Sequence, residues 1–291
     1  MIIDFHTHTF PDAIAPAAIG KLQAASHTRP FTDGTVNGLR ASMAAAGIDI
    51  SVVLPVATNP KQVPHINDSA SALNARADET GVYSLGGMHP DFPDWEQEME
   101  RLCAAGVRGV KVHPPYQGVD FDDSRYIRIL KKASALGMLA VTHAGLDVGL
   151  PGAEQSTPEK ILRAREQAPD VCLVLAHMGG WRCWDEVEKL LPGTGVYLDT
   201  SFALGSMTSN GDGYYTSEAD LAMLKEEQFL RLISLFGADH ILFGTDSPWG
   251  DQTAALQKIR DLPLSDSDLQ AILGGNAASL FPIRIKKPGN S

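Results

Sequence analysis

Two histidines separated by one residue stand near the beginning of the chain, in the segment Asp4-Phe-His6-Thr-His8. If this segment is part of a β-strand, both imidazoles point to the same face, because side chains alternate along a strand. Two neutral imidazoles held at a fixed separation can bind a transition metal through their ring nitrogens. A His-x-His pair also arises by chance, so the metal-site hypothesis depends on where further ligands lie.

Histidine recurs at a characteristic place along the chain. Six of the nine histidines fall at or just after the end of a short apolar run: His6, His8, His89, His113, His143 and His177. His27 and His65 stand among polar residues and His240 begins an apolar run, so we interpret these three as structural or solvated. The recurrence favours a metal site over a chance pair.

Length and composition indicate a globular protein with a large core. The 291 residues are 44% hydrophobic and 20% charged, and no linker divides them. A formal net charge of −11 would repel nucleic acid and anionic membranes, so we expect neither as a partner and expect a small-molecule substrate instead. The basic residues Arg284, Lys286 and Lys287 near the C-terminus are interpreted as a solvated tail.

Cysteine content and the N-terminal sequence predict a cytoplasmic location. Cys103, Cys172 and Cys183 are an odd number without close metal-type spacing, which fits a reducing compartment. The chain start lacks the charged leader and long apolar stretch of a signal peptide, and no run of about twenty apolar residues follows.

Apolar runs alternate with segments patterned as helices, which indicates an α/β fold with a parallel sheet. The eight runs are 1–5, 50–56, 82–87, 109–112, 138–142, 171–176, 195–199 and 240–245. Several are apolar throughout, as strands covered on both faces are. Capping residues and glycines mark the expected helix ends: Thr157, Ser217, Ser265, Gly47, Gly81, Gly106 and Gly137.

Eight such repeats favour a (β/α)8 TIM barrel, formed as a single domain over residues 1–291. Active sites in these barrels lie at the carboxyl ends of the strands. The longest connections also follow strands, at 9–34, 144–156 and 201–216, and we expect them to form walls or a lid. The glycine-rich part of the last one, 206–215, is expected to be mobile.

Residues able to do chemistry occupy the carboxyl ends of successive predicted strands. They are His6 and His8 on the first, Lys111 and His113 on the fourth, His143 on the fifth, His177 on the sixth and Asp246 on the eighth, and His89 follows the third. The ordered set is far more specific than its first pair.

This set resembles the amidohydrolase superfamily, and within it the amidohydrolase-related group that contains aminocarboxymuconate semialdehyde decarboxylase and related decarboxylases and hydrolases. The matching segments extend over essentially the whole chain: Asp4-Phe-His6-Thr-His8, Gly109-Val-Lys111-Val-His113-Pro114, Thr142-His143-Ala-Gly145, Ala176-His177-Met-Gly-Gly180, Phe243-Gly-Thr-Asp246-Ser-Pro248 and Leu273-Gly-Gly-Asn276-Ala. The segments around His177 and Asp246 are the more specific ones, since many unrelated metallohydrolases begin with His-x-His.

The resemblance implies a metal-dependent enzyme. Four residues would hold one divalent ion, zinc by default: His6, His8, His143 and Asp246. His177 would be the acid or base that deprotonates or orients water, and Asp246 would also belong to the catalytic set. A metal with an open coordination position lowers the pKa of bound water toward about 7.

Lys111 leaves two alternatives open. In two-metal members of the superfamily a lysine on the fourth strand is carboxylated and bridges both ions. In the related single-metal group such a lysine can instead pair with a substrate carboxylate. We favour one ion because the local motifs match that group better, and two ions are the alternative if Lys111 is carboxylated.

Three further residues are expected near the substrate, namely His113, His89 and Trp249. An ordinary hydrogen-bonded histidine is an equal alternative for His113 and for His89, which stands in a tight-turn sequence, and Trp249 could instead plug the barrel mouth. Asp4 shares a strand face with His6 and is expected to orient it.

Two reactions need the same ligands. A hydrolase would direct activated water at an amide, lactone or similar bond of a small carboxylated substrate, and we slightly favour it. The alternative is a non-oxidative decarboxylase, which a substrate-binding Arg29 or Arg40 would favour. Decarboxylases of the group that act on aromatic acids often have glutamate in place of the first histidine, so His6 weakens that subtype but not the muconate semialdehyde type.

Other classes fit less well. Phosphoesterases of the polymerase and histidinol phosphatase type begin with a similar segment, but their later motifs are absent here. A non-catalytic metal-binding protein, or a metal-free enzyme on the same fold, is the alternative from a different class. Dimers are common in the related group, so a homodimer is a further expectation.

Overall fold

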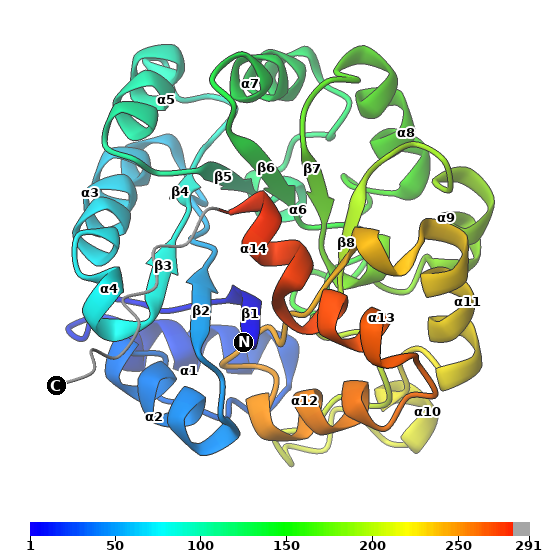
Figure 1. The fold of residues 1–291 in the computed structure, drawn as a ribbon. Coiled ribbons are helices and arrows are strands. Elements are labelled where there is room, and N and C mark those ends of the chain that lie inside the picture. The colour runs from blue at the N-terminus through cyan, green and yellow to red at the C-terminus, as the bar shows by residue number, and fades with distance from the viewer. Residues whose placement is uncertain (282–291) are drawn as a thin grey trace, which may run out of the picture.

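The computed structural model describes residues 1–281 and shows a ring of parallel strands surrounded by helices (Figure 1). In chain order the strands are β1 (Ile3–Thr7), β2 (Ile50–Val53), β3 (Val82–Ser84), β4 (Gly86–Gly87), β5 (Gly109–Val112), β6 (Leu139–Thr142), β7 (Leu173–Leu175), β8 (Tyr197–Asp199) and β9 (Ile241–Leu242). The α-helices are α1 (Ala15–Ser26), α2 (Val36–Ala46), α3 (Val63–Asn74), α4 (Ala77–Thr80), α5 (Trp95–Ala104), α6 (Pro114–Gln117), α7 (Ser124–Ala135), α8 (Pro158–Gln167), α9 (Trp184–Leu190), α10 (Glu218–Leu221), α11 (Glu226–Phe236), α12 (Gln252–Arg260), α13 (Asp266–Gln270) and α14 (Asn276–Leu280). Short turns of other helix types are η1 (Pro60–Gln62), η2 (His177–Gly179), η3 (Ala238–His240) and η4 (Ala271–Gly275).

Each of the eight predicted runs coincides with a strand, although β1 extends two residues beyond the first run, and the third run contains two strands. β3 pairs with β2 and β4 pairs with β5, so the backbone hydrogen bonds of this run change from the preceding strand to the following strand at Leu85. A Cβ on Gly86 would lie 2.5 Å from Leu102 of α5, and one on Gly87 would lie 2.9 Å from Ile66 of α3. The two glycines therefore allow these helices to approach the strand closely.

Backbone hydrogen bonds close the ring between the last strand and the first. The Phe5 N–H donates to the Phe243 carbonyl at 2.8 Å, and the Asp246 N–H donates to the His6 carbonyl at 2.8 Å. Thr7 also forms a parallel bridge with Ser247. The parallel sheet thus returns to its own first strand, and the predicted (β/α)8 barrel is confirmed.

Apolar side chains fill the barrel interior and the space outside it. One cluster gathers residues from strands all around the ring, which can meet only inside it: Ile3, Phe5, Ile50, Val52, Leu54, Leu85, Leu139, Val141, Val174 and Leu242. Ala277 of α14, the red helix across the near end of the barrel in Figure 1, joins this cluster. Alternate strand residues such as Val53 and Val110 pack in the larger outer cluster. Both faces of the strands are therefore buried, and the interior is a packed core.

The long connections after the first and seventh predicted strands contact each other. The His27 ring stacks on Tyr214 with 3.7 Å between ring centroids, and His27 Nδ1 lies 2.7 Å from Asp212 Oδ2. The segment 206–215 contacts the end of α1, and its expected mobility stays a prediction. His27 has the structural role that the sequence allowed.

Most predicted helix ends are confirmed. Gly47 and Gly81 end α2 and α4 in the left-handed conformation, each with a φ of 70°. Ser217 forms the predicted capping box at the start of α10. Thr157 precedes α8 as predicted, but its hydroxyl makes no capping hydrogen bond, and Pro158 at the first position favours the helix start there.

Three further expectations concern the basic C-terminal segment, membrane-spanning helices and the cysteines. The basic residues Arg284, Lys286 and Lys287 lie outside the described residues. Within residues 1–281, no helix is long and apolar enough to cross a lipid bilayer. The three cysteines are free thiols, as their odd number and spacing indicated.

The Phe5→Ala variant should lose about 3–5 kcal/mol of unfolding free energy, because the Phe5 side chain is completely buried inside the barrel. Leu235→Ala on α11 is the control: Leu235 is 47% exposed, so its truncation should cost no more than about 0.5 kcal/mol. Urea unfolding followed by circular dichroism measures both variants. Equal losses would contradict the assignment of Phe5 to the core.

Candidate active site

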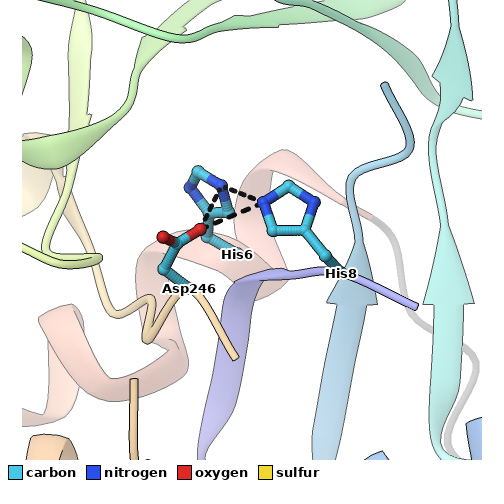
Figure 2. A group of neighbouring side chains, drawn as sticks. All are labelled: His6, His8 and Asp246. Atoms are coloured by element: carbon cyan, nitrogen blue, oxygen red, sulfur yellow. Dashed lines mark hydrogen bonds and ion pairs between the residues drawn. The ribbon is translucent and has the colours of Figure 1, made fainter. Parts of the chain in front are cut away.

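Three side chains from the two ends of the sequence converge at the carboxyl ends of β1 and β9 (Figure 2). His8 Nε2 lies 3.1 Å from His6 Nε2 and 3.0 Å from Asp246 Oδ1. His6 Nε2 lies 3.3 Å from the same carboxylate oxygen. The structure thus brings together three of the four residues expected to bind one metal.

Outer hydrogen bonds fix where the two imidazoles carry their protons. His8 Nδ1 donates to the Leu54 carbonyl at 2.8 Å, and His6 Nδ1 donates to Asp199 Oδ2 at 2.8 Å. A carbonyl or an ionised carboxylate can only accept, so each ring has its proton on Nδ1 and a lone pair on Nε2. Two nitrogen lone pairs and a carboxylate oxygen therefore face one another with no proton between them.

This donor set fits a divalent metal ion. Imidazole nitrogen and carboxylate oxygen are accepted ligands of zinc and manganese, and a cation removes the repulsion among three acceptors. The side chains of His8 and Asp246 are 17% and 12% exposed, so one side of the group is open. Open coordination is what a catalytic metal needs.

Burial and neighbouring charges keep the group in the protonation state that metal binding requires. Burial lowers the pKa of His6 to about 4, so its ring is neutral at pH 7. Burial alone would raise the pKa of Asp246, but His8 and His6 outweigh it and hold that pKa below the usual range. At Asp199 burial likewise raises the pKa, but the charge and hydrogen bond of His6 outweigh burial and lower the pKa to about 2. Both carboxylates are therefore ionised.

A second pair of facing nitrogens lies beside the first group. His143 Nδ1 is 3.2 Å from His177 Nε2. His143 Nε2 donates to the Leu146 carbonyl at 2.9 Å and His177 Nδ1 donates to the Ser201 carbonyl at 3.0 Å, so the facing nitrogens again carry lone pairs. Burial lowers the pKa of both rings. His143 thus lies next to His177 and outside the compact group that contains His6.

His113, His143 and Asp147 form another close group, but their protons point differently. His113 Nδ1 accepts from the Tyr116 N–H, which leaves its proton on Nε2, 3.4 Å from Asp147 Oδ2. His143 Nε2, 3.8 Å from the same oxygen, donates to a carbonyl. Because both of these nitrogens carry protons, neither presents a lone pair toward Asp147, and the lone pair of His143 on Nδ1 faces His177 instead. Burial raises the pKa of Asp147 to about 6.

Lys111 is a buried ammonium at the end of β5. It is 1% exposed and lines the same cavity as His6, and no carboxylate of residues 1–281 lies within ion-pair distance of it. Burial lowers the pKa of Lys111 to about 8, although Asp199 and Asp246 oppose the shift. A lysine that merely extends to solvent from a strand end is therefore ruled out.

A cavity of about 1120 Å³ opens at this end of the barrel. Eight predicted site residues line it: His6, His8, Lys111, His113, His143, His177, Asp246 and Trp249. The barrel rule therefore places these residues together, as expected.

Three predicted residues do not line this cavity. His89 accepts a hydrogen bond from the Asp91 N–H at 3.1 Å, which gives it the structural role of the tight turn. Arg29 lies over the Phe31 ring, 5.6 Å from its centroid. Arg40 on α2 is likewise not part of the cavity lining, so neither arginine is placed to bind a substrate there.

Sequence reasoning missed the residue that orients His6. Asp4 accepts a hydrogen bond from the His6 backbone N–H at 3.3 Å, but Asp199 holds the ring. The Asp4 carboxylate also accepts hydrogen bonds from the Thr245 backbone N–H and from the side-chain amide of Gln252, the first residue of α12. Asp199 ends the seventh predicted strand just as the histidines end theirs, and this signal could have identified it.

Close packing restricts Gly244, which lies two positions before Asp246. A Cβ on Gly244 would lie 2.9 Å from the Cβ of His6 and 3.3 Å from that of Ser201. Asp246 itself has a φ of 63°, a left-handed backbone conformation that residues other than glycine adopt only at an energetic cost. Both features belong to the segment that brings Asp246 beside His6 and His8.

Comparison with known proteins agrees with this geometry. The model of a family described as amidohydrolase matches residues 3–283. A search of curated proteins finds no match.

Several solved structures share the fold. The uncharacterised TIM-barrel protein Bb4693 from Bordetella bronchiseptica is 18% identical with a TM-score of 0.74, and the alignment covers 97% of this chain and 98% of that one. 5-Carboxyvanillate decarboxylase from Sphingomonas paucimobilis is 18% identical with a TM-score of 0.69, and the alignment covers 97% of this chain and 99% of that one. A dihydroxybenzoic acid decarboxylase from Polaromonas sp. JS666 was solved with manganese and the inhibitor 2-nitroresorcinol. It is 17% identical with a TM-score of 0.66, and the alignment covers 97% of this chain and 96% of that one.

The Asp199→Asn variant should bind divalent metal about 10–100-fold more weakly, because the charge that orients His6 and keeps its proton on Nδ1 is lost. Titration of metal-free protein with zinc or manganese against a chromophoric chelator measures the affinity. Asp170→Asn, an exposed change after α8, is the matched control and should leave affinity unchanged. Equal affinities for both variants would refute the orienting role.

Proposed function

The chain belongs to the amidohydrolase family of enzymes, and on this premise we propose that it is a metal-dependent carboxy-lyase that removes carbon dioxide from a small carboxylated molecule. The observation that carries the proposal is Lys111. Its buried ammonium shares a cavity with the metal-binding group and has no carboxylate partner among the described residues. A substrate carboxylate can take that place.

The similar structures support a carboxy-lyase better than the hydrolase that the sequence slightly favoured. Two of those reported above bear the names of decarboxylases of aromatic acids, and one of them holds manganese. Hydroxylated aromatic acids are therefore the first substrates to test. Because His6 stands where many aromatic-acid decarboxylases of the group have glutamate, muconate-type acids should be tested beside them.

The metal would be held by His6, His8 and Asp246, with His143 as the further ligand that the family resemblance implies. A bound divalent ion acts as a Lewis acid that polarises an oxygen of the substrate. Zinc and manganese both accept nitrogen and oxygen ligands. Zinc is the expectation from sequence, and manganese is supported by the similar decarboxylase.

Lys111 would pair with an anionic oxygen of the substrate. A charge pair in a buried cavity is stronger than one in water, because the surroundings screen it less. The pairing would orient the carboxylate beside the metal-binding group and keep it from rotating. Trp249 and His113, which line the same cavity, would bound the substrate on its other sides.

His177 would move the proton. Its Nδ1 proton is held by the Ser201 carbonyl, so the ring can accept a further proton only on Nε2. In the proposed reaction His177 takes a proton from solvent on Nε2 and donates it to the substrate carbon that carries the ionised carboxylate. The carbon–carbon bond to the carboxylate then breaks, its electron pair stays with the protonated carbon skeleton, and carbon dioxide leaves, so that the proton gained balances the carboxylate lost.

The facing nitrogens of His143 and His177 favour a second arrangement with two ions. Burial lowers the pKa of Lys111 to about 8, so part of its amine is neutral at pH 7 and can react with carbon dioxide to form a carbamate. A carbamate at Lys111 would supply oxygen ligands to both ions. Elemental analysis decides between the arrangements by giving one or two ions per chain.

Metal-loaded enzyme should release carbon dioxide from 2,6-dihydroxybenzoate, 5-carboxyvanillate or a muconate-type acid in this panel, and the His177→Gln variant should lose at least about 100-fold in rate. Carbon dioxide is measured by a coupled assay, and removal of metal with a chelator should abolish its release. Water uptake into a lactone or amide substrate, detected with ¹⁸O-labelled water and without carbon dioxide release, would identify a hydrolase instead.

Binding of an aromatic carboxylate should weaken as pH rises through about 8. The Lys111 ammonium attracts an anion only while it is protonated, so the Kd should rise about tenfold per pH unit above the pKa. Calorimetry between pH 6.5 and 9.5 measures this, and Lys111→Met should bind more weakly and lose the dependence. Lys131→Met on α7 is the exposed control, and the same pH profile in both variants would exclude Lys111.

A further inference from the structure

The cavity extends well beyond the metal-binding group. Its volume of about 1120 Å³ exceeds the roughly 300–1,000 Å³ of sites that bury a drug-sized ligand. Besides the histidines at the barrel mouth, much of its lining comes from α1 and α3, the helices that follow the first and second strands. A single-ring acid held at Lys111 would leave this outer part empty.

The outer part is apolar. We call it the outer groove and define it by Ile14, Leu22, Ile66 and Leu73, all of which line the cavity. Ile66 and Leu73 are seven residues apart on α3, which places them on one face of that helix. Ile14, just before α1, is 52% exposed and is one of four large apolar side chains that are exposed within residues 1–281. An exposed apolar lining of this kind marks a binding site for an apolar group.

Basic side chains stand at the rim of the outer groove, in a protein whose net charge is −11. Lys21, Lys61 and Arg76 line the cavity and are exposed. Arg76 lies 3.7 Å from Glu79, whereas Lys21 and Lys61 have no ion-pair partner within residues 1–281. Asp12 is the acidic side chain of this rim. The local excess of positive charge fits an anionic ligand.

We propose that the outer groove binds the distal part of the substrate, an apolar segment that ends in a second anionic group beside Lys21 and Lys61. The inference rests on the proposed function, which places the reacting carboxylate at Lys111. Because the groove and the metal-binding group belong to one cavity, a single molecule can reach both. The substrate class is an elongated acid with anionic groups at both ends, and the distal anion is a carboxylate or a phosphate.

A ladder of probes tests each part of this assignment on the metal-loaded full chain by calorimetry. Benzoate occupies only the inner site, 4-octylbenzoate adds an apolar chain, and 4-(7-carboxyheptyl)benzoate replaces the terminal methyl group by a carboxylate. The chain should lower the Kd at least about tenfold through burial of apolar surface. The terminal anion should lower it about threefold more at low salt, as an exposed ion pair does. A matched phosphonate distinguishes the two kinds of anion by which of them binds more tightly.

Paired variants show which residues produce the increases in affinity that the apolar chain and the terminal anion give. The double variant Lys21→Glu with Lys61→Glu should abolish the threefold gain of the terminal anion, and Lys131→Glu on α7 should not. Leu73→Asp should remove the tenfold gain of the chain, whereas Leu235→Asp, at an exposed position of α11 away from the cavity, should keep it. Benzoate should bind all four proteins equally.

The outcomes separate this inference from the proposed function. If 4-octylbenzoate binds no more tightly than benzoate, or if Leu73→Asp leaves its affinity unchanged, the outer groove does not bind substrate, while benzoate binding and carbon dioxide release remain intact. If the gains of the ladder persist but Lys111→Met leaves benzoate affinity unchanged, the proposed role of Lys111 fails and the groove assignment stands.

Discussion

The chemistry of this protein depends on four imidazole rings whose outer nitrogens are held by hydrogen-bond acceptors. Each acceptor, whether a backbone carbonyl or the carboxylate of Asp199, takes the single proton of its ring. The inner nitrogens are left as lone pairs that meet in two close contacts, 3.1 Å and 3.2 Å long. Lone pairs at this separation repel one another, so the scaffold holds an arrangement that a cation stabilises.

The balance of buried charge points the same way. Asp199 and Asp246 are both buried and ionised, and Lys111 is the buried ammonium on which both carboxylates act electrostatically. Asp147, with a pKa of about 6, adds a third carboxylate, so the region is negative, and burial makes an uncompensated charge costly. A divalent cation offsets this negative charge and leaves the Lys111 ammonium able to attract an anionic substrate. One charge distribution thus fits both a divalent cation and an anionic ligand.

The stability of the fold and the demands of the site are separated in space. Apolar residues such as Phe5 and Val141 fill the barrel interior, and α14 contributes Ala277 at one end. The polar residues gather at the opposite end, where the strands finish and the connections begin. Backbone strain is found there as well, as the left-handed conformation of Asp246 and His177 shows. The packed core can support such a site because the two share few residues.

Sequence patterns predicted the barrel and most of its site because both follow from local rules. Fully apolar runs identify strands buried on both faces, and a parallel barrel brings every strand end to one rim, so a histidine at a strand end is a site residue. His89 breaks this rule, because its run ends in a turn where a backbone N–H takes the ring nitrogen. Arg29 and Arg40 were chosen by position along the chain, which does not determine where a long side chain points.

What the sequence determined by itself was the kind of candidate site: which residue types stand at which strand ends, and therefore a group suited to a metal in an α/β barrel. Only the tertiary structure decided how those residues pair. The partnership of His6 with Asp199 spans 193 positions, and the pairing of His143 with His177 depends on which nitrogen each backbone carbonyl engages. Proton position on an imidazole is set by atoms that are distant in the chain and near in space, so no local pattern contains it.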